Sequence, residues 1–117
     1  MTPENIDHCK VVEDLSPSIT EINYLRRTLR GNWMIPLRFC HTRGTIAHGG
    51  TISFILDTSM FLLLSALSNN EKGGLSLGLN IQFFKACKPG KVNVSSKMIK
   101  EGKNIVFGSC DLHQGDD

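Results

Sequence analysis

The 117-residue chain lacks several features that would place it in a specialised class of protein. Its four cysteines are widely spaced and form no CxxC pair, which argues against a zinc ribbon and against a secreted disulfide framework. The formal net charge is only +2, so the composition gives no polyelectrolyte signal for nucleic acid. We therefore expect free thiols in a reducing compartment and no nucleic-acid partner.

Targeting and membrane signals are also weak. The N-terminal stretch MTPENIDHCKVVED lacks the basic start and apolar centre of a signal peptide. The apolar run over residues 52–67 is shorter than the roughly 20 residues that a spanning helix needs. Asp57, inside that run, would cost about 2.5–3.5 kcal/mol at the centre of a bilayer. We expect a cytoplasmic protein with no membrane span, and the mitochondrion is the alternative compartment.

The N-terminal third gives local signals that lead to two predicted elements. A capping-box pattern, SITE, is followed by apolar residues at helical spacing, which predicts a short amphipathic helix over residues 19–30. Residues 33–40 have a strand composition that Pro36 weakens, so we expect this strand near a sheet edge. Before them, Val11-Val12 predicts only the start of a short strand.

The rest of the chain has stronger periodicity. Residues 49–68 predict a helix that is apolar on most of its circumference, so other elements must cover it. The segment GLSLGLNIQFF alternates apolar and polar residues and predicts a strand over residues 75–83. Residues 92–99 and 105–112 predict two more strands, joined by a hairpin turn at Glu101-Gly102. Together these elements predict a single α+β domain in which antiparallel strands curl around a central helix.

The carboxylate of Asp57 stands alone in the apolar helix. Burying a carboxylate is costly unless it is paired or used in chemistry. In a structural role its partner would be Ser53 or Ser59, and in a functional role it would act as a general base or a nucleophile. Gly49 and Gly50 lie at the helix start, where unpaired N–H groups can stabilise an oxyanion, although a plain tight turn is the alternative.

Two stretches, GTIAHGGTISFILD and GLSLGLNIQFFKACKPGKVNVSSKMIKEGKNIVFGSCDL, resemble the hotdog-fold acyl-CoA thioesterases. The resemblance spans residues 44–112 and is to the phenylacetate-pathway and mammalian acyl-CoA thioesterase type, related to the 4-hydroxybenzoyl-CoA enzymes. It implies a hotdog fold, with a long helix wrapped by a sheet, that assembles as a homodimer or homotetramer. It also implies hydrolysis of acyl-CoA in lipid metabolism, with no cofactor.

Residues 1–43 do not match the two N-terminal strands of that family, and the chain ends where the family continues into a final strand. We therefore expect one hotdog domain over residues 1–117, divergent at the N-terminus and incomplete at the C-terminus. An alternative is a catalytically impaired, truncated hotdog chain that serves only as a binding or dimerisation partner. A hotdog dehydratase is a third reading, and Asp57 after the glycine pair argues against it.

The resemblance also implies roles for individual residues. Asp57 matches the catalytic carboxylate, and Ser76 matches a serine that positions the attacking water. Gly49, with Gly50 beside it in the substrate-binding loop, matches the helix start whose N–H polarises the thioester carbonyl. Asp57 lies eight residues beyond Gly49, about 12 Å along one helix. Because a reacting carbonyl must lie about 3 Å from both groups, we expect two subunits to share each site.

The histidines and lysines are weaker candidates. His48 is a candidate general base, against a structural role in the helix-start loop. His41 stands where the family group has asparagine, which makes it a candidate for substrate binding, against a surface turn residue. These histidines and Asp57 have no recognised metal spacing, so we predict no metal. Lysines in the last strands and turns either bind the phosphates of CoA or form a solvated sheet edge. They are Lys85, Lys88, Lys91, Lys100 and Lys103.

Overall fold

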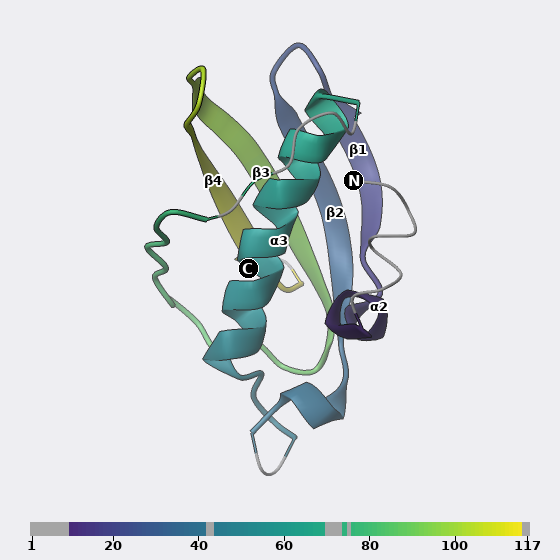
Figure 1. Ribbon diagram of the computed structural model, residues 1–117. Helices are drawn as coiled ribbons and strands as arrows, with labels where there is room; N and C mark the ends of the chain where they lie inside the picture. Colours follow the sequence, from purple (N-terminus) through teal and green to yellow (C-terminus); the bar gives the residue numbers. More distant parts are fainter. Residues whose placement is uncertain (1–9, 42–43, 70–73, 75, 116–117) are drawn as a thin grey trace.

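The computed structural model describes residues 10–41, 44–69, 74 and 76–115. Within them, four strands form one antiparallel sheet in the order β1-β2-β3-β4, and a long helix, α3, crosses one face of it (Figure 1). The strands are β1 (Ser18–Asn23), β2 (Thr28–Ile35), β3 (Gly90–Glu101) and β4 (Val106–His113). The sheet is curled and unclosed, so the prediction of an α+β hotdog fold is confirmed.

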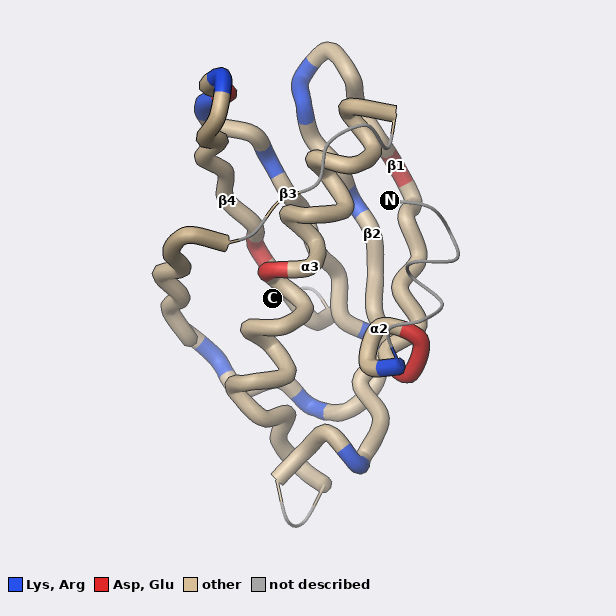
Figure 2. The backbone as a smooth tube through the Cα atoms, in the orientation of Figure 1, with Lys and Arg blue, Asp and Glu red and all other residues tan. Residues whose placement is uncertain are grey.

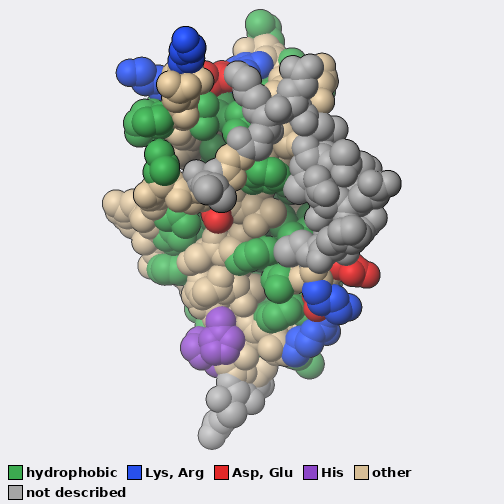
Figure 3. Space-filling model, in the orientation of Figure 1, with side chains coloured by type: hydrophobic (Ala, Val, Ile, Leu, Met, Phe, Trp, Pro, Cys, Tyr) green, Lys and Arg blue, Asp and Glu red, His purple; other side chains and the backbone are tan. Residues whose placement is uncertain are grey.

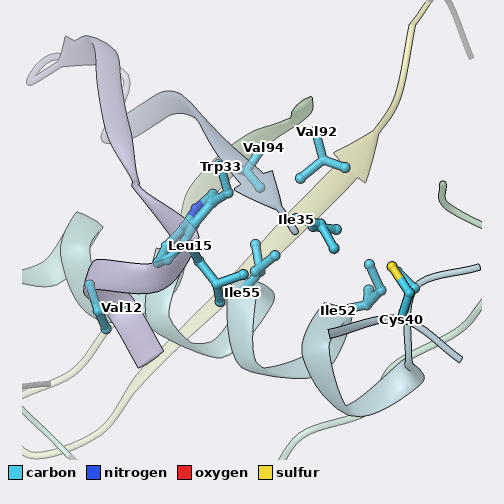
Figure 4. Close-up of a cluster of buried hydrophobic side chains, with 10 residues drawn as sticks. Val12, Leu15, Trp33, Ile35, Cys40, Ile52, Ile55, Val92 and Val94 are labelled. Carbon is cyan, nitrogen blue, oxygen red and sulfur yellow. The ribbon is translucent and has the colours of Figure 1, made fainter. Parts of the chain in front are cut away.

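Helix α3 (Gly49–Leu67) confirms the predicted central helix. Its sheet-facing side is buried at helical spacing, through Ile52, Ile55, Ser59 and Leu63. Ile52 and Ile55 pack against buried side chains of β2 and β3 (Figure 4), and Leu63 forms a second cluster with Leu29 and Met98. Each fully buried aliphatic side chain contributes about 1.5–3 kcal/mol. Among the described residues, α3 is the one helix long and apolar enough to cross a membrane, a test that core helices also pass. The absence of a membrane span stays a prediction.

The predicted helix over residues 19–30 is wrong, because this segment forms the β1–β2 hairpin. The side-chain oxygen of Asn23 accepts the Arg26 N–H at 2.9 Å and closes a turn, and Arg27 continues it with a φ of 58°. Pairing of β2 with β3 then outweighs local helix propensity. The region that resembled no family strand therefore supplies two strands of the sheet.

Two smaller expectations about the N-terminal region are also wrong. Val11 and Val12 lie in a short helix, α2 (Lys10–Leu15), whose Val12 and Leu15 side chains join the core. Strand β2 lies inside the sheet between β1 and β3, rather than at an edge. It ends at Ile35, before Pro36, and a 3-10 helix, η1 (Leu37–Phe39), follows.

The C-terminal half confirms one prediction and overturns another. Strands β3 and β4 form the expected hairpin, whose turn is closed by the Gly102 N–H donating to Ile105 O at 2.9 Å. By contrast, the described residues 76–84 form no strand and pair with no neighbour. Leu77 is 82% exposed and Phe83 57% exposed, so the apolar alternation of this segment covers no core within the described chain.

Candidate active site

Asp57 and Ser76, two predicted catalytic residues, lie in contact. Asp57 is half-buried in the middle of α3, where it is the acidic position coloured red in Figure 2. The Ser76 hydroxyl donates a hydrogen bond to Asp57 Oδ1. The two structural alternatives have other partners, because Ser53 donates to Gly49 O at 2.8 Å and Ser59 accepts from the Trp33 indole. The catalytic roles of both residues stay predictions.

The start of α3 presents backbone donors, as its glycines suggested. His48 is the N-cap and its N–H donates to Phe39 O at 3.2 Å. The next N–H groups, of Gly49 and Gly50, have no acceptor among the described residues. A Cβ at Gly50 would meet nothing within 4 Å, and one at Gly49 would lie 3.5 Å from the Phe83 ring. A ligand can therefore approach the Gly50 backbone closely, and the Phe83 ring borders the position of Gly49.

His41 and His48 stack beside the helix start. Their ring centroids lie 4.2 Å apart, with the planes tilted by 48°. Both residues are exposed, and Figure 3 shows histidine side chains gathered at one end of the α3 face. The His41 N–H donates to Ile46 O at 2.8 Å, which brings the backbone at His41 close to the residues just before α3. No three potential metal ligands converge anywhere in the described part of the chain.

One segment links the two halves of the candidate site. Ser76 contacts Asp57, and Phe83 lies against Gly49, so residues 76–83 reach from the middle of α3 to its N-terminus. Sequence reasoning missed Phe83, because it read this residue as one member of a strand face. Its contact depends on where the segment returns to the helix, which no local pattern encodes.

The predicted phosphate-binding lysines fall into two groups. Lys91 lies at the start of β3 and Lys100 near its end, which places them about 30 Å apart along the strand. Lys85 and Lys88 precede β3, whereas Lys103 lies in the β3–β4 turn (Figure 2). A single CoA molecule therefore meets at most one group through its phosphates in one subunit.

A buried polar chain lies behind the candidate site, and sequence reasoning missed it as well. The Trp33 indole N–H donates to Ser59 Oγ at 3.1 Å, and Ser96 Oγ donates to Ser59 O at 3.4 Å. Ser96 also contacts the Cys110 sulfur at 3.6 Å. Burial raises the pKa of the Cys110 thiol. These contacts link α3 to β2, β3 and β4. The residue that α3 contributes, Ser59, lies two residues from Asp57.

The sequence profile of the thioesterase superfamily matches residues 44–117, more than half of the chain. The chain therefore belongs to the thioesterase superfamily, as the sequence motifs predicted. This membership supports thioester hydrolysis in general as the activity. Comparison with curated proteins finds no significant match to the sequence.

Solved structures share the fold at low sequence identity. A phenylacetic acid degradation-related protein from Ralstonia eutropha is 19% identical, with a TM-score of 0.85, covering 100% of this chain and 83% of that chain. A thioesterase from Haemophilus influenzae is 23% identical, with a TM-score of 0.75, covering 96% and 78%. Zebrafish thioesterase superfamily member 2 is 18% identical, with a TM-score of 0.73, covering 88% and 71%. At these identities the likeness shows the fold alone.

Proposed function

We propose that the protein hydrolyses acyl-CoA thioesters to a free carboxylic acid and CoA. The observation that carries the proposal is the contact between Ser76 and Asp57, on a helix that begins with unpaired backbone donors. The Ser76 hydroxyl donates a hydrogen bond to Asp57 Oδ1, whereas Asp57 Oδ2 has no donor among the described residues. That oxygen is available to take a proton from water, and the half-buried position suits a general base.

In the proposed reaction, water loses a proton to Asp57 and its oxygen adds to the thioester carbonyl carbon. The negative charge that develops on the carbonyl oxygen is stabilised by the Gly49 N–H, with help from the positive end of the α3 dipole. The intermediate then collapses, the C–S bond breaks, and the CoA thiolate takes the proton held by Asp57. The same carboxylate as a nucleophile is the alternative route to these products.

We infer that two subunits share each site. Asp57 and Gly49 lie about 12 Å apart along α3, too far for one carbonyl to meet both in one chain. Three features support a homodimer or homotetramer: the exposed Leu77, Leu79 and Phe83, the exposed start of α3, and the outer edge of β4, which has no strand neighbour among the described residues. We propose the cytoplasm as its compartment, with the mitochondrion as the alternative, because the spacing of the cysteines fits free thiols in a reducing environment.

A hydrolysis screen over short, medium, long and aromatic acyl-CoAs tests the activity. We expect turnover with at least one class. Asp57→Asn should nearly abolish it without changing the elution volume in size-exclusion chromatography, and Ser76→Ala should reduce it less. Full turnover by folded Asp57→Asn would refute the catalytic assignment. A protein that dimerises but hydrolyses none of these thioesters would instead be the non-catalytic binding partner.

A further inference from the structure

The β1–β2 and β3–β4 turns lie at the same end of the sheet, away from the start of α3 (Figure 1). The β1–β2 turn and the β3–β4 turn are tied by an ion pair in which Arg27 Nε donates to Glu101 Oε2 at 2.8 Å. The backbone supports the same contact, because the Met98 N–H donates to Arg27 O at 3.0 Å. We call residues 24–27 and 99–105 the tip surface.

The tip surface exposes four large apolar side chains, and none of them belongs to the buried core of the described chain. Leu25 is 93% exposed and Ile99 is 65% exposed. Tyr24 and Ile105 are 57% and 49% exposed. Single exposed apolar residues are ordinary, but four on two adjoining turns form a patch of the kind that marks an interaction site.

The same surface is basic. It holds Arg26, Arg27, Lys100 and Lys103 against one acid, Glu101, so its net charge is +3 (four minus one). Glu101 is paired with Arg27, which leaves three cations around the apolar side chains. Figure 2 shows basic positions at both turns, and Figure 3 shows basic and hydrophobic side chains side by side at this end.

We propose that the tip surface docks the protein on membranes that contain anionic lipids. Lysine and arginine attract the negative surface of such a membrane, and a tyrosine at headgroup depth has both its ring and its hydroxyl satisfied. Leu25 and Ile105, at the turns, enter the acyl boundary below the headgroups. A nucleic acid or an acidic protein matches the charge, but neither matches the apolar side chains at the apex. The mode is peripheral, and α3 stays packed on the sheet.

Vesicle co-sedimentation of the full chain tests the proposal. We expect binding to vesicles made of equal parts phosphatidylcholine and phosphatidylserine, and none to pure phosphatidylcholine. Binding should weaken as salt is added, because the lysines and arginines are exposed. Absence of binding to the anionic vesicles would overturn the proposal. The test is independent of thioester hydrolysis, so its failure leaves the proposed activity untouched.

Matched variants locate the contact. Lys100→Glu with Lys103→Glu should lower vesicle partitioning roughly tenfold or more. Leu25→Ser with Ile105→Ser should also lower it clearly. The controls are at the opposite end of the sheet and change the same number of side chains. They are Lys88→Glu with Lys91→Glu, and Leu37→Ser with Ile46→Ser, where Leu37 is 66% and Ile46 42% exposed. They should bind like wild type, and circular dichroism confirms folding of every variant.

Two outcomes would overturn the membrane assignment. If the tip variants and the controls lost vesicle binding equally, the overall charge and hydrophobicity of the protein would drive binding, and no defined surface would be involved. If charge reversal lowered vesicle binding but the Leu25→Ser, Ile105→Ser variant still bound like wild type, the tip surface would be a site for a soluble polyanion, such as a nucleic acid or an acidic protein.

Discussion

The indole of Trp33 and the hydroxyl of Ser59 form a hydrogen bond of 3.1 Å inside the core, between β2 and α3. Both side chains are almost completely buried. Ser59 lies two residues from Asp57, so this bond fixes how α3 is rotated and how far it is shifted on the sheet. The position of the carboxylate opposite Ser76 depends on that placement.

Removing this bond should therefore cost both stability and turnover. Trp33→Phe deletes the donor and part of the packing volume, and we expect a loss of about 1–3 kcal/mol in the free energy of unfolding. Urea denaturation measures it. Ser59→Ala should cost a similar amount, because it leaves the indole N–H unpaired in the core. If the two residues act through this bond, the double variant should lose less than the sum of the single losses.

Gly31 should tolerate no side chain. It lies in β2, and a Cβ there would come within 2.6 Å of the Ser18 backbone oxygen in β1. Gly31→Ala must push β1 away, and we expect a loss of about 1–3 kcal/mol in unfolding free energy. Gly78→Ala is the control, since a Cβ at Gly78 meets nothing within 4 Å. Equal melting temperatures for the two variants would contradict the close approach of β1 and β2.

The pKa of the Cys110 thiol should be visible in its reactivity. Burial raises this pKa, so at about pH 8.5 the folded chain holds less thiolate than the unfolded chain. Iodoacetamide should label Cys110 more slowly in native protein than in urea, as mass spectrometry can follow. Because the pKa of this thiol is higher in the folded chain, the protonated thiol favours folding. This stabilisation is complete at pH values below the pKa of the unfolded state, and it is lost as the pH rises through the pKa of the folded state. Equally fast labelling in both states would contradict the burial.

Sequence predicts best the elements whose hydrogen-bond partners lie close by along the chain. The long apolar run identifies α3, and the turn at Glu101-Gly102 identifies β3 and β4 as the two strands of one hairpin. The β1–β2 hairpin was mistaken for a helix because its pairing with β3 joins residues about 70 positions apart, such as Leu29 and Ser96. The alternation over residues 76–83 places the apolar side chains on one face of an extended segment. A strand also needs a neighbouring strand to pair with, and the alternation does not predict whether one is present.

The sequence also identified only some of the residues of the candidate site. The resemblance to thioesterases identified Asp57 and Ser76 as two site residues, and the structure brings them into contact. It could not identify Trp33 as a support of α3, nor Phe83 as a neighbour of Gly49, because both contacts depend on tertiary packing. Sequence reasoning treated the two groups of lysines as one phosphate-binding surface. They lie close together in the sequence, but β3 separates them in the structure.

The shared site makes the sharpest prediction. One variant carries Asp57→Asn and so lacks the base, and the other carries Gly49→Pro and so lacks the N–H donor. Each homodimer should be inactive. In a mixed dimer, one site collects both defects, while the other pairs an intact Asp57 with an intact Gly49 from the opposite chain. Mixing the two variants, with time for subunit exchange, should therefore restore turnover toward half of wild type per heterodimer.

The structure offers a matched control for the proline. Gly49 is the first residue of α3, where proline is well tolerated, and His48 before it is already extended, with ψ at 141°. Gly49→Ala keeps the N–H, and its Cβ makes only an ordinary contact with Phe83 at 3.5 Å. Gly49→Ala should therefore retain most turnover where Gly49→Pro loses it. If both functional groups came from the same chain, every chain in the mixture would keep its own defect. Folded, exchanging variants would then recover nothing, and a site shared between subunits would be excluded.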